Sequence, residues 1–125
     1  PATLMVVDDD PEIRELLADY LGRHGYHVLT AEGANALYQQ LAEHTPDLLI
    51  VDVMMPGDDG FTICRELRKT NDTPIIMLTA HSEPSAIEQA RDAGVHEFMA
   101  KPVSATKLNA KIKRIIEHPR SFIRT

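Results

Sequence analysis

The feature that most constrains the fold of this chain is a regular alternation of short apolar runs with longer segments of helical periodicity. The first apolar run, Leu4–Val7, is followed at helical spacing by Ile13, Leu16, Leu17, Tyr20 and Leu21. Further strands are expected at 26–31, 48–51, 75–79 and 97–100, and further helices at 34–43, 61–69, 84–93 and 105–117. Parallel strands need crossover connections, which cover the sheet with helices. The pattern therefore predicts a doubly wound α/β sandwich on a mostly parallel, five-stranded sheet.

The residues between these runs favour the same boundaries. The dipeptide Asp10-Pro11 is typical of a helix N-cap followed by proline at the first helical position. Gly22, Gly25 and Gly94 stand where helices are expected to stop. A chain of 125 residues with 43% hydrophobic composition fits a single core. We expect one domain over residues 1–119, with 120–125 as a tail or the start of a linker.

Charge and cysteine content exclude several classes of function. The net charge is −6, from 13 basic and 19 acidic residues, so direct binding to a nucleic acid is not expected. Cys64 is the only cysteine, which excludes an internal disulfide and a multi-cysteine zinc site. No apolar run approaches the roughly 20 residues that span a bilayer, and the first residues lack a basic signal-peptide region. A cytoplasmic location without membrane contact is expected, and no glycine-rich nucleotide loop occurs.

Polar residues follow the predicted strands at the points where these end. The first strand is followed by Asp8-Asp9-Asp10, the third by Asp52, the fourth ends at Thr79, and the fifth precedes Lys101. In an open parallel sheet, ligands bind beyond the carboxyl ends of the strands. If these four strands are neighbours, Asp8, Asp9 and Asp52 bring three negative charges against the single charge of Lys101. A divalent cation would balance the excess, and oxygen ligands favour Mg²⁺.

From about Thr3 to Glu117 the sequence resembles the response-regulator receiver domains of two-component signalling systems. The matching motifs are Asp8-Asp9, the segment 51–57 (VDVMMPG) with Asp59-Gly60 behind it, Thr79-Ala80 and Lys101-Pro102. The resemblance implies a flavodoxin-like sandwich with strand order 2-1-3-4-5, an order for which such a domain is a known example. It also implies a cis peptide bond between Lys101 and Pro102.

The same resemblance implies the chemistry of the strand ends. Asp52 would be the phosphoacceptor, and Asp9 and Asp52 would bind Mg²⁺ together with the backbone carbonyl of Met54. Asp8 would act mostly through bound water. The phosphoryl donor would be a phosphohistidine on a partner histidine kinase or phosphotransfer protein, or a small acyl phosphate. A carboxylate is a usable nucleophile here because phosphoryl transfer is mainly positioning and charge stabilisation.

The resemblance further implies how phosphorylation is reported. Thr79 and Lys101 would contact the phosphoryl group, and the orientation of Phe98 would follow the state of Thr79. The face formed by the fourth helix, the fifth strand and the fifth helix would change as a result and bind a partner or a second copy. A symmetric homodimer on this face could pair Glu97 with Lys111.

Several other residues receive their own interpretations. Met54 and His81 are placed to admit or block the water that hydrolyses the phosphorylated state, so we expect them to tune its lifetime. The six histidines lack the spacing of a metal site and are otherwise expected on the surface. Cys64 is expected to pack within a helix face. Ile87 is expected to be the only large apolar anchor of its helix, which predicts weak docking of that helix.

Two alternatives compete with a phosphoacceptor domain. The first is a receiver-like interaction module that works without phosphorylation. The second is a phosphatase of the haloacid-dehalogenase type that uses Asp8 as nucleophile, although Glu12 departs from that pattern and the chain is too short for a cap domain. The favoured prediction is a signalling domain rather than an enzyme, one that at most catalyses its own phosphorylation and dephosphorylation.

Overall fold

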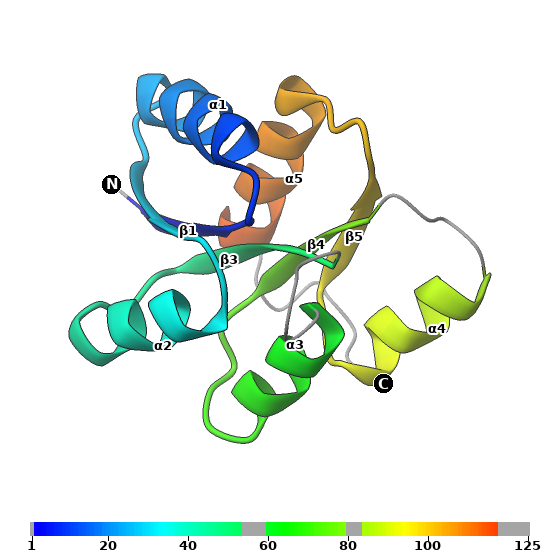
Figure 1. Cartoon of the computed structure of the whole chain (residues 1–125). Coiled ribbons are helices and arrows are strands. Elements are labelled where there is room, and N and C mark those ends of the chain that lie inside the picture. The colour runs from blue at the N-terminus through cyan, green and yellow to red at the C-terminus, as the bar shows by residue number, and fades with distance from the viewer. Residues whose placement is uncertain (1, 54–59, 80–83, 118–125) are drawn as a thin grey trace.

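A five-stranded, entirely parallel sheet with the strand order β2-β1-β3-β4-β5 forms the centre of the molecule (Figure 1). The structure, a computed structural model, describes residues 2–53, 60–79 and 84–117. The strands are β1 (Thr3–Val7), β2 (His27–Ala31), β3 (Leu48–Asp52), β4 (Ile75–Thr79) and β5 (Glu97–Ala100). The helices are α1 (Pro11–Arg23), α2 (Ala34–Glu43), α3 (Gly60–Arg68), α4 (Pro84–Asp92) and α5 (Ala105–Glu117). The predicted fold class and strand order are confirmed.

The helices divide between the two faces of the sheet, with α1 and α5 on one side and α2, α3 and α4 on the other (Figure 1). Alternate residues of β1 serve the two sides: Leu4 and Val6 pack with α1 and α5, whereas Met5 and Val7 pack with α2 and α3. Every residue of β3 and β4 is buried. Burial on both faces explains why these strands are continuous apolar runs rather than alternating ones.

The two ends of α1 show which residues begin and end a helix in this chain. The Asp10 carboxylate accepts a hydrogen bond from the Glu12 amide at 2.9 Å, so the predicted N-cap is confirmed. The helix ends at Arg23, between the two glycines expected near its end, and Gly22 itself is still helical. The chain turns at Gly25, which has a left-handed φ of +92° and donates to the carbonyl of Gly22 at 3.2 Å. A glycine in the last helical turn costs little enough for packing to override it.

Two apolar residues do not lie where helical spacing placed them. Leu16 of α1 is 63% exposed, although it shares the helical spacing of Leu17, which is buried. Ile87 of α4 is 36% exposed and is not the anchor that was expected. Among the described side chains, the buried contacts in this region come from Ala90 of α4 and from Ala93, which follows the helix. Weak docking of α4 stays a prediction, and it now depends on small methyl groups rather than on one large side chain.

Some predictions concern segments that the structure does not describe. Residues 118–125, which include the expected tail, lie outside the described residues, as do Met54 and His81. Within the described segments, none of the helices has both the length and the hydropathy that a membrane span requires.

Candidate functional site

The carboxyl ends of the central strands bring the predicted polar residues together. Asp8 follows β1, Asp52 ends β3 and Thr79 ends β4, and their exposed fractions are only 1%, 2% and 1%. Lys101 follows β5, which lies beside β4. Buried polar groups at the ends of adjacent parallel strands are the usual position for a site in this fold class.

Three carboxylates form the centre of this site. Ligand oxygens of Asp8, Asp9 and Asp52 all lie within 4.8 Å of one another, with Asp9 exposed and the other two buried. Lys101 Nζ lies 2.9 Å from Asp52 Oδ1 and 3.8 Å from Asp8 Oδ2. The Lys101 amide donates to the carbonyl of Thr79 at 2.7 Å, and the peptide bond from Lys101 to Pro102 is cis, as expected. The lysine thus points into the carboxylate cluster.

Burial and crowding change the acidity of one of these carboxylates. Burial raises the pKa of Asp8 from 3.8 to about 6, and the neighbouring charge of Asp52 adds to the rise. The Asp10 amide and the Lys101 ammonium oppose this increase. Asp8 Oδ2 is buried and has no hydrogen-bond partner among the described residues, its contact with Lys101 being an ion pair at 3.8 Å. A crowded, all-oxygen cluster with such an acceptor fits a hard divalent cation such as Mg²⁺.

Asp8 is held in place through its main chain as well as its side chain. Its amide donates to the carbonyl of Ala31 on β2 at 3.1 Å. Its Oδ1 accepts from the Asp10 amide at 2.9 Å, and Asp10 in turn caps α1. Arg14 Nη1 donates to the Asp8 carbonyl at 2.7 Å. The turn between β1 and α1 is therefore fixed by hydrogen bonds on both sides of Asp8.

The position of Asp52 depends on a close approach of α3. A Cβ at Gly60, the first residue of α3, would lie 2.6 Å from the Asp52 carbonyl oxygen and 2.8 Å from Val53 Cα. The Gly60 amide donates to the Val53 carbonyl at 3.0 Å. Only glycine lets the helix start this close to the main chain that carries Asp52.

The structure describes the positions of two residues that were expected to report phosphorylation, Phe98 and Glu97. Phe98 is half-buried, packs against the core on the side of α2, α3 and α4, and is the register neighbour of Met77. Glu97 pairs within one chain, with Lys111 at 3.5 Å and with Arg114 at 2.9 Å. Pairing of Glu97 across a dimer stays a prediction.

Sequence patterns did not indicate two arginines that bind main-chain carbonyls, Arg14 and Arg68. His96 also departs from the expected surface position, since it is half-buried and its Nδ1 accepts from the Ile75 amide at 3.4 Å. Cys64 is fully buried in α3, as expected.

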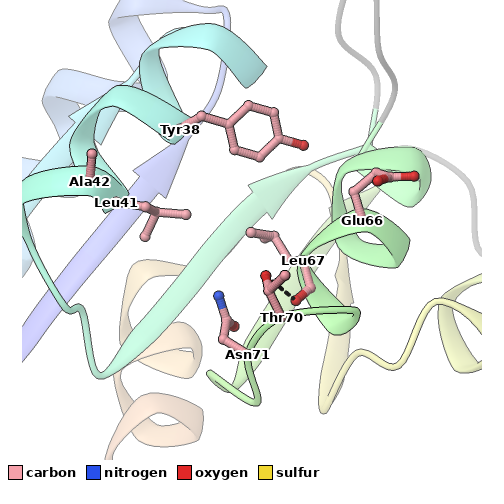
Figure 2. Close-up of a pocket in the computed structure, with 7 residues that line it drawn as sticks. All are labelled: Tyr38, Leu41, Ala42, Glu66, Leu67, Thr70 and Asn71. Carbon is pink, nitrogen blue, oxygen red and sulfur yellow. Dashed lines mark hydrogen bonds between the residues drawn. The ribbon is translucent and has the colours of Figure 1, made fainter.

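The described residues line several hollows besides the carboxylate cluster, and two of them are the largest of these by volume. One of about 440 Å³ adjoins the site, because Lys101 and Pro102 line it together with apolar residues of α1, including Ile13 and Leu16. The other, of about 630 Å³, lies between α2 and α3, where the Tyr38 ring reaches toward α3 (Figure 2). Its lining contains none of the residues of the carboxylate cluster. The first hollow is therefore the one that bears on the site.

Comparison with known proteins agrees with this geometry. Residues 4–113 match the response regulator receiver domain family. The chain is 37% identical to the transcriptional regulatory protein AfsQ1 of Streptomyces coelicolor, over 91% of this chain and 51% of that protein. It is 38% identical to the transcriptional regulatory protein ResD of Bacillus subtilis, over 90% of this chain and 47% of that protein. The chain thus spans about half the length of these curated relatives.

Two solved structures of response regulators are similar to this chain over nearly the whole length of both proteins. A putative response regulator from Chloroflexus aurantiacus has a TM-score of 0.86 at 38% identity, covering 94% of this chain and 98% of that chain. The chemotaxis protein CheY4 of Vibrio cholerae has a TM-score of 0.85 at 28% identity, covering 91% and 98%. Fold, strand-end carboxylates and sequence agree, and the chain belongs to the response regulator receiver domain family.

Proposed function

We propose that Asp52 is the phosphoacceptor of this receiver domain and that Asp8, Asp9 and Asp52, with the backbone carbonyl of Met54, hold Mg²⁺. The observation that carries the proposal is the contact of Lys101 Nζ with Asp52 Oδ1 at 2.9 Å, inside a cluster of three carboxylates. Asp52 is the carboxylate that the ammonium contacts most closely, whereas Asp8 lies 3.8 Å away. Asp8 would act mostly through bound water.

The residues of the chain then divide the work of phosphoryl transfer. Mg²⁺ supplies positive charge beside the phosphoryl oxygens when it is bound. An oxygen of Asp52 forms the new bond to phosphorus while the bond from phosphorus to the donor histidine breaks, and the electron pair stays on the imidazole nitrogen. Lys101 and the hydroxyl of Thr79 stabilise the transferred oxygens. The domain accepts the group and at most catalyses its own phosphorylation and dephosphorylation, so it acts as a signalling module.

The donor would be a histidine kinase or phosphotransfer protein, or a small acyl phosphate. The apolar hollow beside Lys101 supports docking of a protein donor, because it places exposed Leu16 and Pro102 next to the carboxylate cluster. Exposed apolar residues grouped at a functional site are typical of interaction surfaces. A helix that carries the donor histidine and apolar neighbours would fit this surface.

The response would leave the domain through α4, β5 and α5. Phosphorylation adds roughly −1.5 to −2 charge, which would draw the Thr79 hydroxyl inward and allow Phe98 to turn. The changed face would bind an output, a partner or a second copy, and a homodimer there is one form of this response. Residues 1–119 would form the receiver domain. Met54 and His81 would tune the lifetime of its phosphorylated state.

Phosphorylation with acetyl phosphate tests the proposal. Intact-mass measurement should show one added phosphoryl group only when Mg²⁺ is present. Asp52→Asn should abolish this product, while Asp8→Asn should only weaken it. Labelling that survives Asp52→Asn but disappears in Asp8→Asn would instead support a phosphatase-like use of Asp8. A parent chain that is never labelled would support an interaction module that works without phosphorylation.

A further inference from the structure

Arg14 contacts the acidic site without contributing a ligand to it. Its Nη1 donates to the backbone carbonyl of Asp8 at 2.7 Å, in half-buried surroundings. Its own amide donates to the carbonyl of Asp10 at 3.0 Å, which is the first hydrogen bond of α1. One residue therefore joins the start of the helix to the main chain just beyond β1.

The Asp8 carbonyl needs such a partner because it lies past the end of the sheet ladder. Register pairing of β1 ends at Val7, which faces Ala31 on β2 and Val51 on β3. The Asp8 amide still reaches the Ala31 carbonyl, but the Asp8 carbonyl lies beyond these pairs and its donor is Arg14. This carbonyl belongs to the planar peptide unit between Asp8 and Asp9, so its orientation fixes how the two Cα atoms that carry these carboxylates lie relative to each other.

The contact of Arg14 differs in kind from that of Lys101. Lys101 Nζ binds carboxylate oxygens, at 2.9 Å from Asp52 and 3.8 Å from Asp8. The Arg14 guanidinium binds a main-chain carbonyl, so its hydrogen bond fixes geometry rather than neutralising a carboxylate. Removal of these two cations should therefore affect the binding of a divalent cation in opposite directions.

We infer that Arg14 is a positioning residue for the cation site, holding the peptide between Asp8 and Asp9 so that their carboxylates stay grouped with Asp52. The inference rests on the proposed function for the use of Mg²⁺ at this site. Partners that orient metal ligands typically contribute about tenfold or more to metal affinity. Loss of Arg14 should weaken Mg²⁺ binding even though a positive charge has been removed.

Calorimetric titration of the full chain with Mg²⁺ alone tests whether loss of Arg14 weakens or strengthens Mg²⁺ binding. Arg14→Met should raise the dissociation constant by about tenfold, the lower end of the range for such partners. Arg14→Lys, which keeps a donor and the charge, should recover most of the affinity. Lys101→Ala should bind Mg²⁺ at least as tightly as the parent. Arg23→Met is the matched control, because Arg23 lies on the same helix in an exposed ion pair with Asp19.

The inference would be overturned if Arg14→Met bound Mg²⁺ as tightly as the parent. It would also be overturned if Arg14→Met bound Mg²⁺ more tightly, which is the result that charge removal alone predicts. Amide NMR spectra of the metal-free proteins give a second readout. Arg14→Met should shift or broaden the amides of Asp9 and Asp10, while Arg23→Met should leave them unchanged. If the parent binds no Mg²⁺, the proposed metal site fails, and these spectra still decide whether Arg14 positions the turn. Unchanged amides in Arg14→Met would refute that role.

Discussion

Arg68 lies directly against Gly94 and binds its carbonyl. The Nε of Arg68 donates to the Gly94 carbonyl at 2.9 Å, and a Cβ at Gly94 would lie 2.9 Å from Arg68 Cγ. The same guanidinium donates to the carbonyls of Asn71 at 3.1 Å and Thr73 at 2.6 Å. Arg68 thus joins the end of α3, the loop before β4 and the turn after α4.

This contact predicts a coupled effect of two substitutions on stability. Gly94 has a left-handed φ of +77° and contacts Arg68, whereas Gly25 has a φ of +92° with nothing within 4 Å of an added Cβ. Gly25→Ala should cost only the backbone strain, about 1 kcal/mol, and Gly94→Ala should cost more. The excess should disappear in an Arg68→Ala background. Urea denaturation of the four variants measures it, and equal costs in both backgrounds would contradict the contact.

Gly60 provides a second steric prediction, this time at the site. An added methyl group would collide with the Asp52 carbonyl at 2.6 Å, where no flexible side chain can yield. Gly60→Ala should lower the free energy of unfolding by about 1–3 kcal/mol and slow labelling of Asp52. Gly33→Ala is the control, because nothing lies within 4 Å of its added Cβ. Unfolding curves and labelling rates equal to those of Gly33→Ala would show that the collision is relieved without moving Asp52.

The raised pKa of Asp8 predicts how the metal-free domain responds to pH. Burial raises this pKa from 3.8 to about 6, so the folded chain takes up a proton before the unfolded chain does. The contribution of Asp8 to the free energy of unfolding should therefore be largest below pH 4. It should be lost as the pH rises through 6, with a difference on the order of 3 kcal/mol.

Comparison with Asp8→Asn isolates this effect, because every other ionisable group is present in both proteins. The difference in unfolding free energy between parent and Asp8→Asn should change in favour of the parent between pH 7 and pH 5. Denaturation in the presence of a chelator at both pH values measures it. A difference that is the same at both would mean that Asp8 titrates at its ordinary value.

The switch proposed for Phe98 can be followed directly. Beryllofluoride, which mimics the phosphoryl group, should shift amide NMR signals within α4, β5 and α5, residues 84–117, as well as near Asp52 and Thr79. Asp52→Asn is the control, because it should not respond. Shifts confined to the strand ends, with α4 and α5 unmoved, would refute transmission to this face.

Much of the fold followed from the pattern of apolar residues. The bounds of β4 and α5, Ile75–Thr79 and Ala105–Glu117, agree with those expected, because burial on defined faces imposes a strong periodicity. The prediction did less well for Leu16 and Ile87, because helical spacing alone does not show which edge of an apolar face the neighbouring elements cover. Exposure at the edge of a face depends on the packing of helices that are distant in sequence.

The site was predictable to the extent that strand ends determine it. Asp8, Asp52 and Lys101 were expected to converge, and they do, because parallel strands place their carboxyl ends at one edge. Arg14 and Arg68 were not foreseen. Their partners are main-chain carbonyls, which carry no residue-specific signal in the sequence.

The alanine contacts of α4 have an energetic consequence for the domain. Ala90 of α4 and Ala93, just after the helix, each bury a single methyl group, worth about 0.8 kcal/mol per buried carbon. The leucines and isoleucines under α1 and α5 bury several times more. Among the side chains that the structure describes, displacement of α4 on its own would therefore expose little buried apolar surface. Such a local opening can lie far below the free energy of global unfolding. On this account, one edge of the surface would rearrange while the central strands keep their packing.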